Sequence, residues 1–230
     1  MEILRKIPVQ IGAEEVARML RMDEKLAKQV NGEDLVRVAN SLVDARAVYT
    51  AGYIDDRNEE ATNVEGRKFT SRVLAKNLQK LGRVFPYILT IGGALENEAA
   101  TRGMLQRLFL ENAADLAIAL ARMHLEKYLA EKYELGGVSH LGPGQLDWPI
   151  QQQKELFSFF QVPEAALGVR LTESLMMVPR KSVSGLIFPT KATFTACQLC
   201  PKENCPQRQA PYSESLRVSH GLEVKQSSLN

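Results

Sequence analysis

Three cysteines near the C-terminal end of the chain have the spacing that most directly suggests chemistry. Cys197, Cys200 and Cys205 form a C-x2-C-x4-C pattern, which can bring thiolates around one zinc ion or one iron–sulfur cluster. Three ligands leave such a site incomplete, so the fourth would be a residue such as His220 or an exchangeable molecule. Three thiols that hold no metal are the alternative.

Residues 168–188 gather hydroxyl-bearing, small and turn-forming residues in one segment. The alternation over 169–174 predicts a half-buried strand, and the β-formers at 183–188 predict a second one. Pro179 to Ser182 would form the reversal between them. Together with Ser184, this reversal would place hydroxyls on one small surface, although an ordinary hairpin explains the pattern equally well.

The loop at residues 139–149 is dense in turn formers and contains the only tryptophan, Trp148. Pro143-Gly144 and Pro149 indicate a chain that bends repeatedly and passes close to other groups. A connection whose tryptophan fills the core is the alternative to a binding loop.

The order of residues in the 168–188 segment resembles the activation domain of cobalamin-dependent methionine synthase. The resemblance rests on Leu-Thr-Glu-Ser at 171–174, Pro179, Ser-Val-Ser-Gly at 182–185 and the closing Phe188. In that family the domain binds S-adenosylmethionine and presents it to a cobalamin that has left the catalytic cycle by oxidation. The resemblance therefore implies S-adenosylmethionine as ligand, a corrinoid-binding protein or methionine synthase subunit as partner, and an electron donor.

The family also has an Arg-x-x-x-Gly-Tyr pattern in the loop that precedes this segment. Here His140, Gly144 and Gln145 occupy those positions. Histidine lacks the permanent charge and planar fork of arginine, and glutamine keeps hydrogen bonding but loses the ring. The ligand contacts that the resemblance implies are His140, Gly144, Gln145, Ser174, Ser182, Ser184, Phe194 and Thr195.

These expectations favour a stand-alone activation module, a component of a methionine synthase-like methyltransferase system. It would support reductive methylation of a protein-bound cobalamin by S-adenosylmethionine and so serve methionine biosynthesis. Two alternatives remain open: a metal or iron–sulfur redox module that has lost S-adenosylmethionine binding, and a scaffold subunit of a corrinoid methyltransferase.

Composition and charge indicate which other classes of protein are not expected. The 230 residues are 45% hydrophobic and 24% charged, as in ordinary globular proteins. A formal net charge of +2 does not indicate nucleic-acid binding. No apolar run reaches the length of a membrane span, and Met1 to Lys6 lack the apolar core of a signal peptide, so we expect a cytoplasmic protein without a membrane partner.

The periodicity predicts one α+β domain over residues 1–210, with a helical N-terminal part, and an exposed tail over 211–230. In that domain, helices would pack around a bent antiparallel sheet, as in the activation-domain family. Helices are expected over 14–30, 33–48, 94–100, 104–133 and 151–160, and a short helix or a mixture of strand and helix over 69–81. Besides the 168–188 pair, strands are expected to begin at 49 and to run over 84–91, with a polar loop over 55–67.

Overall fold

A continuous apolar run forms β6 (Arg83–Thr90), where seven consecutive residues are buried. Burial on both faces explains why this strand carries apolar residues without alternation. The chain then passes through Gly92, whose φ of 77° favours glycine, into α5 (Ala94–Ala100) and the long α6 (Met104–Lys132). These three elements are confirmed predictions. The computed structural model describes residues 1–23, 26, 29–161, 163–191, 193–205, 208, 210–220 and 222.

The chain divides into two compact units. The first unit comprises Met1–Tyr49, Ile88–Tyr128 and Phe160–Val183, and the second comprises Thr50–Tyr87, Leu129–Phe159 and Ser184–Asn230. Three elements run along the chain from one unit into the other: β6, α6 and β10 (Ser182–Thr190).

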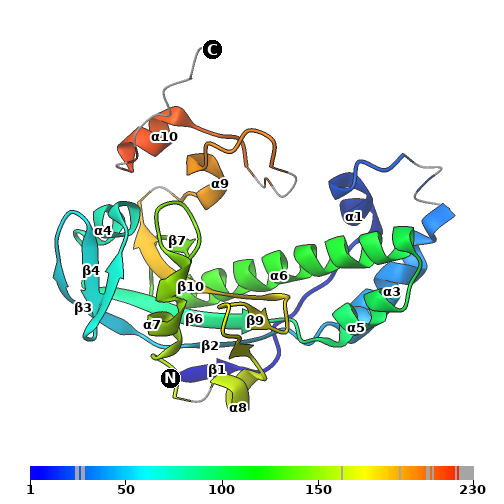
Figure 1. The fold of residues 1–230 in the computed structure, drawn as a ribbon, viewed down its shortest axis with the longest axis horizontal. Coiled ribbons are helices and arrows are strands. Elements are labelled where there is room, and N and C mark those ends of the chain that lie inside the picture. The colour runs from blue at the N-terminus through cyan, green and yellow to red at the C-terminus, as the bar shows by residue number, and fades with distance from the viewer. Residues whose placement is uncertain are drawn as a thin grey trace. The chain divides into compact units, whose positions relative to one another are not determined.

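In the first unit, β1 pairs with β2 in antiparallel register, and β2 pairs with β6 (Figure 1). Strands β8 and β9 pair with each other. Its remaining elements are helices. The bounds are β1 Glu2–Leu4, α1 Ala13–Met19, α3 Gly32–Leu42, β2 Arg46–Tyr49, α8 Pro163–Leu167, β8 Arg170–Leu171 and β9 Met177–Val178.

In the second unit, β6, β3, β4 and β5 pair in that order, and β7 pairs antiparallel with β10. The β3–β6, β3–β4 and β4–β5 pairs are also antiparallel. The bounds are β3 Gly52–Arg57, β4 Ala61–Val64, β5 Arg67–Thr70, α4 Arg72–Leu78, β7 Gly137–Leu141, the 3-10 turn Ile150–Gln152, α7 Gln153–Phe157, α9 Ala196–Leu199 and α10 Glu214–Ser219. Helices together with antiparallel strands confirm the predicted α+β class.

The predicted loop over 55–67 is wrong, because this segment contains most of a three-stranded meander. The side chain of Asn58 accepts the amides of Glu60 and Ala61 at 2.9 and 2.8 Å and so shapes the first turn. Glu65 and Gly66 both have positive φ, as a two-residue hairpin turn of type I′ requires. Solvent-facing strands carry polar residues, which makes them resemble a loop in the sequence.

The predicted hairpin over 168–188 is also different in the structure. The reversal lies at residues 172–176, where the Thr172 hydroxyl accepts the Met176 amide at 3.1 Å and Leu175 has a φ of 65°. This side-chain bond gives the backbone an alternative to a strand ladder. The later strand, β10, pairs with β7 rather than with residues 169–174.

Two helical predictions and one predicted loop have different ends. Within the helix predicted over 14–30, α1 ends at Met19 and Arg21 follows with a φ of 53°. Residues 24, 25, 27 and 28 of this prediction lie outside the described residues. The helix predicted over 33–48 ends at Leu42, and β2 takes residues 46–49, since its apolar residues are buried in a row. Part of the predicted 139–149 loop belongs to β7.

A buried core holds the second unit together. It includes Trp148, Phe188 and Phe194, and Leu216 from α10 packs against it. The prediction of one domain over 1–210 with a tail over 211–230 stays a prediction. Of the predicted tail, the structure describes residues 211–220 and 222, and these include α10.

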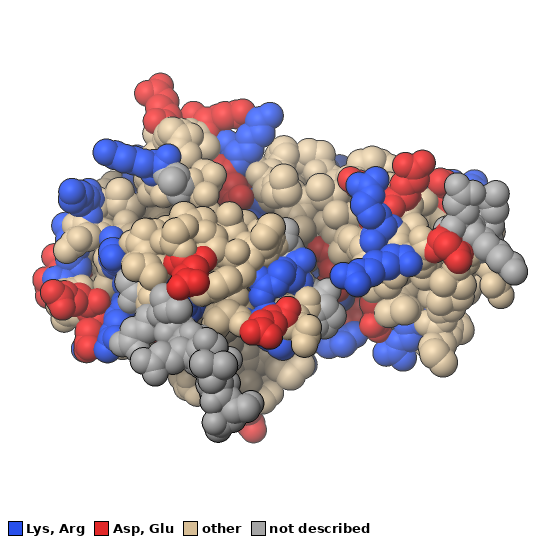
Figure 2. All heavy atoms as spheres, turned by 90° about the horizontal axis from the view of Figure 1, so that it is seen from above, with Lys and Arg blue, Asp and Glu red and all other residues tan. Residues whose placement is uncertain are grey.

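The length of the helices and the charge of the surface bear on membrane and nucleic-acid partners. Among the described residues, no helix is both long and apolar enough to cross a membrane. On the face shown in Figure 2, Lys and Arg side chains are interspersed with Asp and Glu and form no basic stripe.

Candidate ligand-binding loop

Two glycines let the backbones of β7 and β10 meet where the 142–149 loop begins. A Cβ on Gly142 would lie 2.5 Å from the carbonyl oxygen of Ser184, and a Cβ on Gly185 would lie 2.3 Å from that of Leu141. Real Cβ atoms do not approach so closely, so both positions require glycine. The first residues of the loop therefore lie in direct contact with the backbone of Ser184 and Gly185.

Hydrogen bonds close the loop on itself. The side-chain oxygen of Gln145 accepts the amide of Gly142 at 3.0 Å, and the carbonyl of Gly142 accepts the amide of Gln145 at 3.0 Å. Gly144 has a φ of 87°, and its amide donates to the carbonyl of Trp148 at 2.8 Å. These hydrogen bonds satisfy backbone groups within the loop and hold it closed.

Side chains then fasten the loop to β5 and α4. The carboxylate of Asp147 accepts the Ser71 hydroxyl at 2.5 Å and the Arg72 amide at 2.7 Å. The indole of Trp148 donates to the side-chain oxygen of Gln152 at 2.9 Å, and the same oxygen accepts the amide of Thr70 at 2.8 Å. The loop is thus held at both of its ends.

Four predicted site residues come together around this loop. His140 is a buried residue of β7, opposite Ile187 in the register, and Gly144 and Gln145 follow in the loop. Ser184 meets the start of the loop through its carbonyl. The side-chain nitrogen of Gln145, Nε2, makes no hydrogen bond to a described residue, so this donor is available to a ligand.

Two other predicted residues, Ser174 and Ser182, belong to the first unit. The Ser174 hydroxyl lies 3.0 Å from that of Thr172 within the β8–β9 turn. The Ser182 hydroxyl lies 2.9 Å from the hydroxyl of Thr90 and donates to the carbonyl of Pro179 at 2.7 Å. Both hydroxyls therefore have structural partners.

Phe194 and Thr195 begin the segment that leads to α9. The ring of Phe194 is 4% exposed and lies 4.3 Å from that of His220, centroid to centroid. Its amide donates to the hydroxyl of Ser139 at 3.0 Å. The amide of Thr195 donates to the side-chain oxygen of Gln198 at 2.9 Å, which completes the start of the helix.

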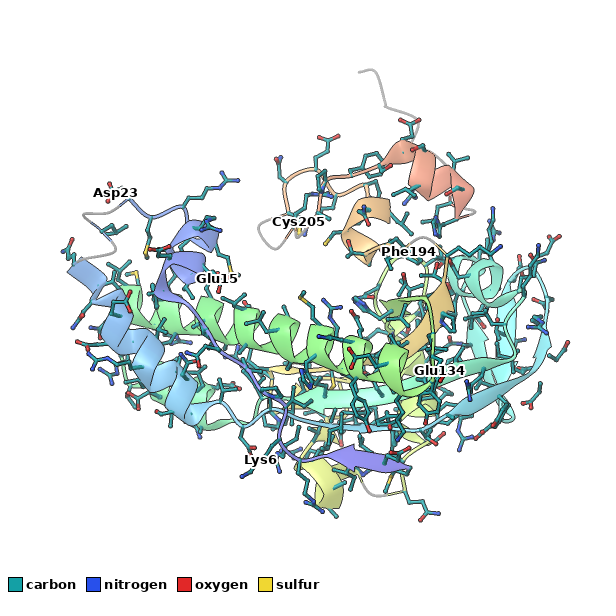
Figure 3. All side chains as sticks on the ribbon, turned by 180° about the vertical axis from the view of Figure 1, so that it is seen from behind. Lys6, Glu15, Asp23, Glu134, Phe194 and Cys205 are labelled. Carbon is teal, nitrogen blue, oxygen red and sulfur yellow. The ribbon has the colours of Figure 1, made fainter. Side chains whose placement is uncertain are left out.

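The three cysteines surround an arginine. Arg208 donates to the carbonyls of Cys197 at 2.9 Å, of Cys200 at 3.3 Å and of Lys202. Figure 3 shows Cys205 in the segment that follows α9. Throughout the described part of the chain, no group of three His, Cys, Asp or Glu residues is arranged to hold a metal ion. His220, the suggested fourth ligand, instead contacts the carbonyl of Leu216 through Nδ1 at 2.7 Å. These contacts give the predicted metal site no support, and it stays a prediction.

The basic pair at 180 and 181 is engaged in the first unit. A hydrogen bond to Glu96 raises the pKa of Arg180 above its ordinary value, and Coulombic attraction adds to it. The ammonium of Lys181 donates to the carboxylate of Asp115 and to the carbonyl of Glu111 at 3.2 Å. Both residues therefore fasten the start of β10 to helices.

Comparisons with known proteins relate the segment that contains this loop to a known family. The model of a family described as "Vitamin B12 dependent methionine synthase, activation domain" matches residues 119–207. The chain resembles this activation domain. The match includes the 142–149 loop, β10 and the cysteine segment, so it confirms the resemblance inferred from the sequence.

Solved structures support the fold. The MetH reactivation domain, solved bound to AdoHcy, superposes with a TM-score of 0.54 at 17% sequence identity. The alignment covers 78% of this chain and 71% of that one. At this identity the similarity shows the activation-domain fold and no more. No curated protein matches the chain.

Sequence reasoning missed several residues that shape the loop. Asp147 lies within the loop already singled out, but its partners are 75 and 76 positions away along the chain. Gly142 lies within the predicted 139–149 loop, and Gly185 ends the Ser-Val-Ser-Gly sequence at 182–185. Only the pairing of β7 with β10 reveals that their backbones meet.

Proposed function

We propose that this chain supports reductive methylation of a protein-bound cobalamin by S-adenosylmethionine, acting as a stand-alone counterpart of the activation domain. The observation that carries the proposal is the closed 142–149 loop against Ser184-Gly185, within the segment matched by the activation-domain model. The protein with the similar fold was solved with AdoHcy, the product that S-adenosylmethionine leaves after giving up its methyl group.

The chain's own contribution would be binding and orientation. The side-chain oxygen of Gln145 supports the loop, and its side-chain nitrogen Nε2 remains to donate to the carboxylate of the ligand. The glycine backbone of the loop would allow close contact with the ligand, and His140, near the end of β7, is the further contact that we propose. A preorganised loop loses little conformational entropy on binding, which favours a well-placed methyl group.

A cobalamin-carrying partner would supply the remaining chemistry. When reduced by an electron donor, the corrinoid provides the nucleophile that takes the methyl group from the sulfonium, and the thioether leaves. We further propose that this encounter takes place in the cytoplasm. The partner's identity would follow from assays with candidate corrinoid proteins.

Calorimetry with S-adenosylmethionine tests the ligand. The Gln145→Glu variant keeps the oxygen that supports the loop, removes the amide donor and places a negative charge near the ligand carboxylate. We expect its Kd to rise about tenfold or more, as loss of a hydrogen bond to a charged group implies. An unchanged Kd, or no binding by the unaltered protein with its corrinoid partner present, contradicts this binding site.

A spectroscopic assay tests the reaction. The protein is mixed with a corrinoid protein under reducing conditions, and the cobalt spectrum is followed with and without S-adenosylmethionine. We expect conversion to the methylated form only when the chain and S-adenosylmethionine are both present. Equal conversion without the chain would refute the function.

The alternative of a metal or iron–sulfur redox module has less support, because the thiols of the cysteine segment do not form a metal-binding group with other described residues. We therefore propose no redox role for them.

A further inference from the structure

A hollow lies in the second unit, at the opposite end of the β7–β10 pair from the 142–149 loop. It has a volume of about 710 Å³, within the range of small-molecule sites. Gly137 and Thr190, the last register pair of these strands, form part of its wall. The loop follows Leu141, at the other end of β7, so the hollow is a separate site.

Three exposed lysines give this hollow a positive charge. Lys76 and Lys80 lie one helical turn apart on and just after α4, and Lys191 follows β10. The described residues that line the hollow include no carboxylate. None of the three lysines forms an ion pair with a described residue.

Helix capping does not account for these lysines. Cations near a helix C-terminus often compensate its carbonyls, but Arg57 already donates to the carbonyls of Leu78, at 3.0 Å, and of Leu81. The lysine ammonium groups are thus not needed at the end of α4.

Nearby acidic residues are few and placed outside the hollow. Glu59 and Glu60 share a neighbouring hollow with Lys76, and Glu60 pairs with Arg72 at 3.5 Å. Glu134, labelled in Figure 3, is exposed at the end of α6 and does not line the hollow. An anion that enters the hollow would therefore meet little competition from these carboxylates for the lysine ammonium groups.

Part of the remaining wall is apolar, beside the polar side chains of Asn77, Gln79 and Thr190. Leu81 and Pro189 line the lysine hollow and also a smaller one of about 350 Å³, which Tyr53 and Leu135 help to form. Tyr53 is 59% exposed, so its ring is available for stacking. A ligand with anionic groups at one end and a planar apolar group at the other would match both parts.

We propose that this hollow binds an organic phosphate, with its phosphate groups against Lys76, Lys80 and Lys191 and its ring against Leu81, Pro189 and Tyr53. Lysine binds phosphate as a mobile point charge, and a charge-assisted bond is stronger than a neutral one. This site is independent of the S-adenosylmethionine site, so the two proposals can fail separately.

Calorimetry with uridine diphosphate tests the proposal, because this probe contains no adenine to occupy the other site. Pyrophosphate and uridine measure its two halves, and hexaglutamate represents an acidic peptide. We expect uridine diphosphate to bind more tightly than each half and than the peptide. Tighter binding of hexaglutamate would overturn the proposal in favour of a docking surface for an acidic protein.

Variants locate the site. The pair Lys76→Gln and Lys80→Gln should raise the Kd for uridine diphosphate about tenfold or more, since two charge-assisted contacts are lost. The matched pair Lys68→Gln and Lys154→Gln removes the same charge from exposed positions elsewhere in this unit and should change the Kd less than about twofold. Equal effects of both pairs, or no binding of the probe, would refute the site, whatever the result with S-adenosylmethionine.

Discussion

The carboxylate of Asp147 accepts a hydrogen bond from the hydroxyl of Ser71 at 2.5 Å, although the two residues lie 76 positions apart in the chain. Ser71 is also the residue that caps α4, since its oxygen accepts the amide of Leu74 at 3.0 Å. One contact thus couples the start of a helix to the loop proposed to bind the methyl donor. Residues that do not touch a ligand can in this way define its site.

Replacing Asp147 with alanine should destabilise the second unit by about 2 kcal/mol. Two hydrogen bonds to a charged acceptor are lost, and the buried hydroxyl of Ser71 loses its acceptor. Urea unfolding measures the change. The exposed Glu155→Gln substitution serves as control and should change the free energy of unfolding by less than about 0.5 kcal/mol. Equal effects of both variants would show that Asp147 does not fasten the loop.

Gly185→Ala should cost about 3 kcal/mol or prevent folding of the second unit. The added methyl group would lie 2.3 Å from the carbonyl oxygen of Leu141, so the β7–β10 pair must separate. Gly103→Ala is the matched control, because a Cβ at Gly103 meets no atom within 4 Å. Thermal unfolding of both variants provides the measurement, and a Gly185→Ala protein as stable as the control would contradict the close approach.

The sequence could predict those helices and strands whose pattern lies within one short stretch of the chain. β6 and α6 were predictable because a buried run and a long helical period need no knowledge of distant residues. The β3–β5 meander was missed because its exposed strands are polar, and its turn at Glu65-Gly66 carries a weak signal. The predicted 168–188 hairpin failed because the side chain of Thr172 creates a turn within the apparent strand.

The loop itself was predictable in part. Its turn formers identified an irregular segment, and the resemblance selected His140, Gly144 and Gln145. Its support could not be predicted, since the contact between Gly142 and Ser184 and the Asp147 bonds exist only once distant segments are paired. Long-range backbone contact leaves no periodic trace in one sequence.

Substitutions of Gln145 separate support of the loop from ligand binding. Gln145→Leu removes the acceptor of the Gly142 amide and should cost about 1 kcal/mol of stability. Gln145→Glu keeps that acceptor, so its stability should stay within about 0.5 kcal/mol of the unaltered protein. Chemical denaturation distinguishes them, and equal losses in both variants would contradict the role assigned to the Gln145 oxygen.

Arg208→Lys should loosen the cysteine segment. The guanidinium reaches several carbonyls of this segment at once, which a single ammonium cannot do with the same geometry. We expect the alkylation rate of Cys197, Cys200 and Cys205 to rise about tenfold, a local opening of roughly 1.4 kcal/mol. Arg170→Lys, at an exposed position of β8, should leave the rate unchanged. Unchanged labelling of Arg208→Lys would mean that the arginine does not order the thiols.

Because Tyr49 is buried, we expect the free energy of unfolding of the first unit to fall at alkaline pH. Burial raises the pKa of Tyr49, and hydrogen bonds with the side chains of Tyr128 and Glu2 raise it further. The unfolded chain releases this proton near pH 10, whereas the folded chain keeps it. Its contribution to stability is therefore fully present below about pH 10 and declines above it, by up to about 1.4 kcal/mol per pH unit. Urea unfolding between pH 7 and pH 11 should show this decline.

Two phenylalanine substitutions assign the decline to this residue. Tyr49→Phe should lower stability at neutral pH by about 1 kcal/mol, because the hydroxyl contacts are lost, and should flatten the alkaline decline. Tyr53→Phe removes a hydroxyl from a side chain that is 59% exposed, so it should keep the slope of the unaltered protein. If Tyr49→Phe retains the full slope, other groups cause the alkaline loss. If both variants flatten it equally, burial of Tyr49 is not the reason.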